Sequence, residues 1–316
     1  MVAISVIGAL VGTAVLAAFA YPWARWREDF FPGQPPNIRL QPQAWVETDD
    51  FVRFAVLGDS GSGGRNAMEI ATRMAEAYGR APYGLVIHVG DVSYYGSIAD
   101  RWEAVFQRPY APLLDAGVRF EIAVGNHEYE EKPSAYANAE IADLLRLAGE
   151  EGRYYRVRRG PVDFFILDSS TPLITGNAAA EQLAWLEKEL AASDAAWKVA
   201  ALHHPPYSSG KRGSWLQVRE AVEPLFVKYG VDLVLTGHDH FYERTKPQQG
   251  VVYVISGGGC KISPVGSSDF TAVAKATLQF MVIEVEDGKL RASAIDERGR
   301  AFDDFELNKP GPGGSP

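Results

Sequence analysis

Short runs of β-branched and aromatic residues alternate along the chain with segments whose apolar residues recur every three or four positions. The runs predict strands at Phe51–Leu57, Leu85–Val89, Phe120–Val124, Asp163–Leu167, Lys198–Leu202, Val231–Leu235 and Val251–Ile255. The helical spacing predicts helices at Asn66–Tyr78, Ala99–Leu114, Ala178–Leu190 and Trp215–Tyr229. Strands that alternate with helices indicate a layered α/β fold in which most strands are parallel.

The pattern changes after Leu278, where two segments of alternating polarity flank Asp287-Gly288 and predict a hairpin. We assign residues 51–307 to one ordered domain, because 316 residues suit a single large α/β domain. Residues 308–316 are rich in Gly and Pro and are expected to form a disordered tail.

The N-terminal segment, residues 1–20, is uncharged and mostly apolar, and nearly spans a ~30 Å hydrocarbon core. Ala18-Phe19-Ala20 fits a signal-peptidase site, but no Lys or Arg precedes the apolar run. Arg25 and Arg27 follow it and favour a cytoplasmic C-terminal side. A cleaved signal peptide and a membrane anchor both stay open, with a slight balance toward export to the periplasmic or extracellular side. Residues 21–50, rich in Pro and Trp, are predicted to be an extended tether.

Composition narrows the possible partners. The chain has 31 basic and 40 acidic residues and a net charge of −9, which argues against a nucleic-acid partner. A single cysteine, Cys260, rules out an intramolecular disulfide framework and a thiolate-rich zinc site, and we interpret it as structural. The 47% of hydrophobic residues excludes a disordered chain.

Side chains that can bind metals follow five predicted strands in succession. They are Asp59, Asp91, Asn126 with His127, His203, and His238 with His240. Because the loops at the carboxyl ends of strands converge in open α/β sheets, we expect one common site. Imidazole and carboxylate without thiolate suit zinc, iron or manganese, and this number of ligands suits two ions that share a carboxylate. His88, inside a predicted strand, is expected to be a buried, hydrogen-bonded histidine instead.

Five motifs in this order, GDSG, GDVSYYG, GNHE, HHPPYSS and GHDHFYER, resemble the metallophosphoesterase superfamily and specifically its purple acid phosphatase branch. The resemblance extends from Phe51 to Glu306. It implies the calcineurin-like phosphoesterase fold, a four-layer α/β/β/α sandwich of two mixed β-sheets. Most superfamily members have a histidine where this chain has Gly61, whereas Tyr94 stands three residues after Asp91. This replacement marks the purple acid phosphatases, because a phenolate favours Fe(III). The neighbouring Tyr95 is expected to pack on the sheet.

The resemblance also implies a ligand set for each ion. Fe(III) would bind Asp59, Tyr94 and His240, and a second divalent ion (Fe, Zn or Mn) would bind Asn126, His203 and His238, with Asp91 bridging the two. The H-x-P-x-Y spacing selects His203 over the adjacent His204. The latter is either a substrate or supporting contact or a plain loop residue.

Substrate contacts are assigned more loosely. His127 is expected to face the substrate as proton donor or phosphate partner, with an orienting role as the alternative. Lys211 and Arg212 follow the HHPPYSS loop and either bind the phosphate or form a solvated surface pair.

The function implied by the resemblance is hydrolysis of small phosphomonoesters by a metal-bound hydroxide, with His127 and Asp91 as catalytic residues. A phosphodiesterase of the same superfamily, acting on nucleotides or phospholipid head groups, is the alternative, and Gly61 in place of a histidine argues against it. A membrane-tethered binding protein with an inactive site is disfavoured because every expected ligand is present. The sequence gives no indication of the oligomeric state.

Overall fold

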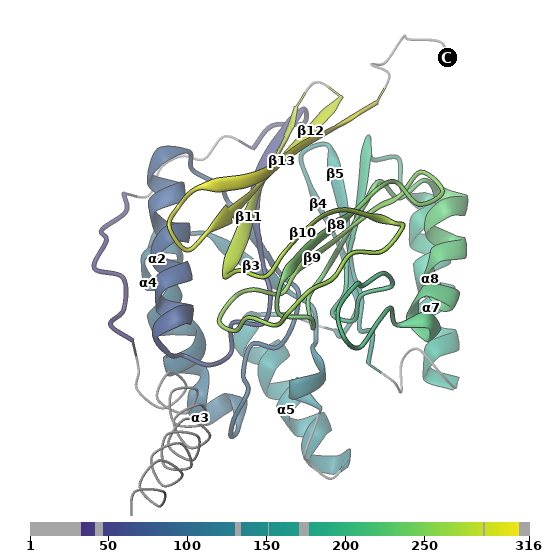
Figure 1. Cartoon of the computed structure of the whole chain (residues 1–316). Coiled ribbons are helices and arrows are strands. Elements are labelled where there is room, and N and C mark those ends of the chain that lie inside the picture. Colours follow the sequence, from purple (N-terminus) through teal and green to yellow (C-terminus); the bar gives the residue numbers. More distant parts are fainter. Residues whose placement is uncertain are drawn as a thin grey trace, which may run out of the picture.

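The computed structural model describes residues 33–41, 47–129, 134–150, 152–170, 177–286 and 288–309. Two mixed β-sheets pack face to face, and helices cover the outer face of each (Figure 1). The expected four-layer sandwich is confirmed. No helix in the described part of the chain is long and apolar enough to cross a membrane. The predicted hydrophobic segment 1–20 and much of the tether 21–50 lie outside the described residues, as do residues 310–316 of the predicted tail.

The first sheet has six strands in the order β13-β12-β11-β1-β2-β3. Its parallel half consists of β1 (Phe51–Leu57), β2 (Leu85–His88) and β3 (Arg119–Ile122). Its antiparallel half consists of β11 (Gln279–Glu286), β12 (Lys289–Asp296) and β13 (Ala301–Asn308). The two halves meet where β1 pairs with β11, so the predicted hairpin extends the sheet that carries the first three motifs.

The second sheet has seven strands in the order β10-β8-β9-β7-β6-β5-β4. Its parallel centre consists of β5 (Val162–Ile166), β6 (Trp197–Ala201), β7 (Leu233–Thr236) and β9 (Val252–Ser256). Antiparallel strands flank this centre: β4 (Tyr155–Arg159), β8 (Tyr242–Thr245) and β10 (Thr271–Lys275). Each sheet therefore has a parallel core that directs its strand ends to the same edge.

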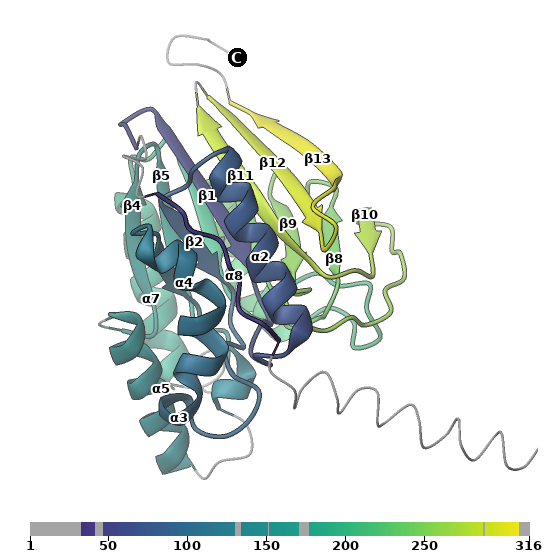
Figure 2. The same ribbon diagram turned by 90° about the vertical axis from the view of Figure 1, so that its left-hand side faces the viewer.

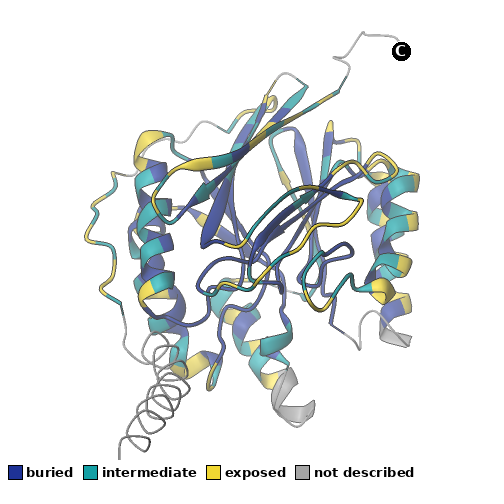
Figure 3. Ribbon diagram, viewed as in Figure 1, coloured by how far each residue is buried: buried dark blue, intermediate teal, exposed yellow. Residues whose placement is uncertain are grey.

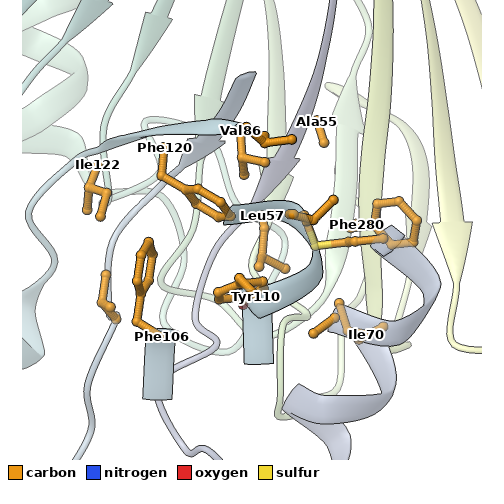
Figure 4. Close-up of a cluster of buried hydrophobic side chains, with 14 of the residues drawn as sticks. Ala55, Leu57, Ile70, Val86, Phe106, Tyr110, Phe120, Ile122 and Phe280 are labelled. Atoms are coloured by element: carbon orange, nitrogen blue, oxygen red, sulfur yellow. The ribbon is translucent and has the colours of Figure 1, made fainter. Parts of the chain in front are cut away.

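Strand β1 is apolar on both faces from Phe54 to Leu57, where both faces are buried. Phe54 points between the sheets, where its ring meets Phe164 of β5 edge-on at 4.9 Å. Ala55 and Leu57 point the other way, toward the helices, into the cluster that contains Phe106 (Figure 4). Figure 3 shows the result: the central strands are buried and the exposed residues lie mainly on the outer surfaces of helices and on loops. The parallel strand ends are thus held rigidly from both sides.

Helices α2 (Arg65–Arg80), α3 (Ile98–Trp102), α4 (Arg108–Asp115) and α5 (Ser134–Ala148) cover the first sheet (Figure 2). Helices α7 (Asn177–Ala192) and α8 (Leu216–Tyr229) cover the second. The predicted helix 99–114 is divided by a π-helical turn, Glu103–Gln107. Pro109 has no N–H to donate to the residue four positions earlier, which gives the turn a local cause.

In the described part of the chain, the sequence did not predict α5, β4, β8, β10, β13 or the 3-10 turn Asn126–Glu128. Three of these strands, β4, β10 and β13, are the edges of their sheets. Strand β4 reads YRVRR, with alternate residues exposed, so its apolar signal is weak. The predicted strands all correspond to strands of the structure within a few residues.

Candidate metal centre

The loops after five strands bring the predicted ligands to one edge of the sandwich. Asp59 follows β1, Asp91 follows β2 and Asn126 follows β3, all in the first sheet. From the second sheet, His203 follows β6, and His238 and His240 follow β7. The site therefore lies where the two sheets meet.

Three of these residues have a left-handed backbone conformation that non-glycine residues rarely adopt. The φ angles are 58° at Asp59, 57° at Asp91 and 69° at His238. Such strain is of order 1–3 kcal/mol per residue and persists only where surrounding contacts enforce it. Glycines make room for it: a Cβ at Gly237 would collide with the Asp59 carboxylate, and one at Gly125 with the Asp91 carboxylate.

One half of the site groups Asp59, Tyr94 and His240. The Tyr94 hydroxyl is 3.4 Å from Asp59 Oδ1 and 3.1 Å from His240 Nε2. His240 Nε2 is in turn 3.5 Å from Asp59 Oδ1. One carboxylate oxygen, one phenol oxygen and one imidazole nitrogen thus face a common point.

The other half groups Asn126, His203 and His238. Asn126 Oδ1 is 3.0 Å from His203 Nε2 and 2.7 Å from His238 Nδ1, and these two nitrogens are 3.3 Å apart. The second ring nitrogen of His203, Nδ1, lies 2.8 Å from the carbonyl of Val89 and donates to it, so Nε2 is the atom available as a ligand.

Asp91 lies between the halves. Its Oδ1 is 3.3 Å from His203 Nε2, and ligand atoms of Asp59, Asp91 and His203 all lie within 4.8 Å of one another in a buried cluster. Ligand atoms on an ion with bonds of about 2.1 Å are separated by about 3.0 to 3.4 Å. The separations observed here fit that spacing, and oxygen with imidazole suits iron, zinc or manganese. The residues present therefore fit a pair of metal ions.

Comparison with known proteins agrees with this geometry. A family model described as calcineurin-like phosphoesterase matches residues 52–242. The chain belongs to the calcineurin-like phosphoesterase family. Among individual proteins, it is 28% identical to tartrate-resistant acid phosphatase type 5 of Oryctolagus cuniculus, over 70% of this chain and 77% of that one. It is 25% identical to purple acid phosphatase 3 of Arabidopsis thaliana, over 83% of this chain and 78% of that one.

Other relatives are considerably longer. The phosphoenolpyruvate phosphatase of Allium cepa is 29% identical over 67% of this chain, but the match covers only 46% of that protein. The solved structure of the purple acid phosphatase PPD1 from yellow lupin superimposes with a TM-score of 0.72 at 20% identity, covering 85% of this chain and 55% of that one. The chain thus spans about half the length of these two relatives, and the likeness to PPD1 concerns the fold.

Burial and neighbouring charges shift the pKa of several residues in this phosphoesterase site. Burial opposes the charged form of His203, but the Asp91 carboxylate outweighs it and raises the pKa of His203 to about 10. Burial and then the Asp59 carboxylate raise the pKa of Tyr94. Burial, followed by the charge on His203, lowers the pKa of His238. A bound cation would take the place of the His203 proton and favour the Tyr94 phenolate.

Glu128, from the GNHE motif, supports the site and was not identified from the sequence. Its buried carboxylate accepts backbone N–H bonds from Gly125 at 2.8 Å, Asp91 at 3.2 Å, Val92 at 2.9 Å and Ser93 at 3.2 Å. Burial and then the Asp91 charge raise the pKa of Glu128 to about 7. It fixes the backbone on both sides of the central carboxylate. In the sequence, the position of Glu128 inside the GNHE motif was the one feature that could have pointed to this role.

The end of the GHDHFYER motif binds neighbouring loops rather than the metal position. Glu243 accepts hydrogen bonds from the Ser209 N–H at 2.7 Å and the Thr271 hydroxyl at 2.6 Å, which holds the loop after His203. Arg244 forms a bidentate pair with Asp303 of β13, at 2.7 and 3.0 Å. The length of this motif therefore reflects loop anchoring.

The two histidines next to predicted ligands lie in different surroundings. His127 is partly exposed at the mouth of the site; its backbone N–H donates to Asp91 Oδ1 at 3.0 Å, and its ring is 4.8 Å from the Tyr94 ring. His204 is buried, with Nδ1 2.9 Å from the Ser169 hydroxyl and its ring 4.2 Å from Trp215. Burial lowers the pKa of His204 to about 3. His203, and not His204, points its Nε2 into the ligand cluster.

The remaining residues assigned from the sequence have different outcomes in the structure. Lys211 and Arg212 are both exposed, but Arg212 Nη1 lies 2.9 Å from His238 Nε2, whereas Lys211 has no polar contact with the described ligands. His88 is fully buried beside the Ser60 hydroxyl at 2.9 Å, which confirms its structural assignment. The expectation for Tyr95 is wrong: it is 43% exposed, because the loop turns its ring outward beside Lys261.

Proposed function

We propose that this chain is a two-metal phosphomonoesterase of the purple acid phosphatase type, acting on small phosphorylated molecules. The observation that carries the proposal is the replacement at Gly61. A Cβ there would lie 2.6 Å from backbone atoms of Val92 and Ser93, so no histidine fits at this position. Tyr94 instead offers its hydroxyl to the position shared with Asp59 and His240.

The ligand chemistry supports Fe(III) at the Asp59, Tyr94 and His240 position, because a phenol oxygen is a hard donor. A divalent ion (Fe, Zn or Mn) suits Asn126, His203 and His238, with Asp91 shared between the two. When bound, two such ions polarise a phosphoryl group and activate water. The chain's own contribution is to hold their ligands at the strand ends with the strained backbone described above.

His127 is the group best placed to donate a proton to the leaving oxygen. Its ring is partly open to solvent, its Nε2 lies 4.0 Å from Asp91 Oδ2, and its backbone is tied to the same carboxylate. An exposed imidazole held beside the site can exchange its proton with water and return to its donor form after each turnover. The named phosphatases among the relatives agree with a phosphomonoester substrate.

The full chain, loaded with iron and zinc, tests the proposal through metal content and hydrolysis of p-nitrophenyl phosphate against bis(p-nitrophenyl) phosphate. We expect about two metal equivalents and a preference for the monoester. Asp91→Asn should lose both ions and nearly all turnover, since both halves share this carboxylate. Asp115→Asn, a change at an exposed residue of α4, is the matched control and should behave as wild type.

Other outcomes would replace the proposal. Preference for the diester would make the chain a phosphodiesterase of the family. Full metal content with no hydrolysis of either compound would make it a binding protein with an inactive site.

We further propose export or membrane anchoring through the apolar segment 1–20. Cell fractionation of the full chain, with protease added to intact cells, tests this. The protein should be found outside the cytoplasm or in the membrane fraction; a soluble cytoplasmic protein would contradict it.

A further inference from the structure

Lys261 lies at the mouth of the metal centre, in the loop after β9. Its Nζ is 3.6 Å from the centre of the Tyr94 ring and 5.3 Å from that of Tyr95, whose hydroxyl is 3.5 Å away. The ammonium group thus covers the face of a proposed metal ligand, although neither composition nor motif singles this lysine out.

The loop that carries Lys261 is anchored directly before it. The Cys260 carbonyl accepts a 3.0 Å hydrogen bond from Asn66 Nδ2, and the Gly259 N–H donates to the Gly58 carbonyl at 3.0 Å. The Cys260 side chain is buried against Ala67 and Tyr94. Because these contacts fix the backbone, the lysine projects over Tyr94 from a rigid base rather than from a free loop.

No carboxylate of the described residues lies within 4.0 Å of the Lys261 ammonium, although Lys228 and Lys309 have such partners in Glu187 and Asp232. A lysine ammonium has three donors, and the phenol of Tyr95 accepts at most one. Arg101 adds positive charge nearby, since its guanidinium lies 5.9 Å from the Tyr95 ring. The mouth of the site therefore offers donors and positive potential toward an anion from solvent.

Lys261 and His127 both contact the ring of Tyr94. His127, the proposed proton donor to the leaving group, borders this ring at 4.8 Å. Arg212 contacts His238 in the other half of the site.

We propose that Lys261 binds a second anionic group, a carboxylate or phosphate, carried on the leaving group of the substrate. The chain would then prefer phosphomonoesters with a second negative charge a few bonds from the scissile phosphate. This inference rests on the proposed phosphomonoesterase function. It assigns Lys261 as a specificity-determining residue, and the metal ligands remain those described above.

The test compares 3-phosphoglycerate with glycerol 3-phosphate, which differ in one carboxylate. We expect the wild-type holoenzyme to favour the carboxylate compound in kcat/KM by about fivefold to tenfold, the size of one partly exposed charge-assisted contact. Lys261→Gln should bring the ratio close to one by slowing only 3-phosphoglycerate, and Lys261→Arg should restore part of it. Lys188→Gln, at an exposed position of α7, is the control and should keep the wild-type ratio.

A binding measurement tests the contact without turnover. Calorimetry with phosphonoacetate and propylphosphonate should show tighter binding of phosphonoacetate to wild type, and loss of that difference in Lys261→Gln. A parallel comparison of the bisphosphate and monophosphate of 1,3-propanediol shows whether a phosphate serves as well as a carboxylate.

Two results would overturn the inference. One is that wild type shows equal kcat/KM for 3-phosphoglycerate and glycerol 3-phosphate and also binds the two phosphonates equally. The other is an equal fall in kcat/KM for both substrates in Lys261→Gln, together with a shifted visible band. That result would show that Lys261 acts through Tyr94 and does not bind the substrate. Absence of hydrolysis of every phosphomonoester by the metal-loaded wild type would overturn the proposed function instead, and the phosphonate measurement would still decide the role of Lys261.

Discussion

Asp59 Oδ2 accepts a 2.9 Å hydrogen bond from the backbone N–H of His238, although the two residues are 179 positions apart in the chain. Asp59 follows a strand of the first sheet and His238 follows a strand of the second. Both residues have positive φ angles. This one contact therefore joins the sheets at the metal centre and enforces the strained backbone on both sides, which leaves Asp59 Oδ1 free to face Tyr94 and His240.

The hydroxyl of Tyr94 is predicted to be the source of a visible charge-transfer band in the iron-loaded protein. Tyr94→Phe keeps the ring, and with it the packing against Cys260 and Ala67, so the fold should survive while the band disappears. Absorption and circular dichroism spectra measure the two effects. Tyr95→Phe is the matched control and should keep the band. A colourless wild type with oxidised iron bound would show that Tyr94 is not a ligand.

Glu128→Gln should weaken metal binding, because the amide loses the charge and one of the two acceptors that hold four backbone N–H groups around Asp91. We expect a loss of metal affinity of about 10- to 100-fold, as for other residues that orient ligands. Titration with zinc measures it. Glu103→Gln, at an exposed position, should bind as wild type. Unchanged affinity in Glu128→Gln would contradict its positioning role.

Arg212 and Lys211 are adjacent but should differ. Arg212 contacts His238 and faces the site, so Arg212→Ala should raise KM for a phosphomonoester by about 3- to 10-fold with a smaller change in kcat. Lys211 has no polar contact with the described ligands, and Lys211→Ala should change KM much less. Steady-state kinetics with p-nitrophenyl phosphate measure both variants. Equal effects would show that the structural distinction between the two side chains has no functional consequence.

Glu150 should make the stability of the fold depend on pH at a place away from the metal centre. Burial, and then a hydrogen bond with Glu121, raise the pKa of Glu150 from 4.5 to about 8. Its proton can be donated to Glu121, whose buried oxygens make no other hydrogen bond among the described residues, although the guanidiniums of Arg159 and Arg119 lie 3.6 and 3.8 Å from Oε1. The folded state thus keeps a proton that the unfolded state releases between pH 4.5 and about 8.

The free energy of unfolding should therefore have its full contribution from Glu150 below pH 4.5 and lose it as the pH rises through about 8. Because Glu150 is only partly buried, we expect a loss on the order of 1 kcal/mol rather than that of a fully buried carboxyl. Glu150→Gln mimics the protonated form and should remove this dependence in urea denaturation. Glu220→Gln, exposed on α8, should retain it. A steeper fall in Glu150→Gln than in wild type would contradict the assignment.

Much of the fold was predictable because its signals are local. The central strands, such as β1 and β5, are mostly apolar, with one charged residue each, since both of their faces are largely buried. The edge strands β4, β10 and β13 were missed because their residues are in part exposed and carry less apolar signal. Tyr95 was misplaced for a related reason: an aromatic residue in a loop can face the core or the solvent, and only the path of the loop decides.

The sequence by itself determined the types of ligand, their order and their positions at strand ends, because a strand and the turn that follows it are written in consecutive residues. Only the tertiary structure decided that His204 is buried against Ser169, that Glu128 holds the backbone of Asp91, and that Lys261 lies over Tyr94. Each of these depends on the packing of loops from different strands. Neighbouring strands of one sheet bring some of these loops together and the stacking of the two sheets brings the others, and no local pattern in the chain encodes them.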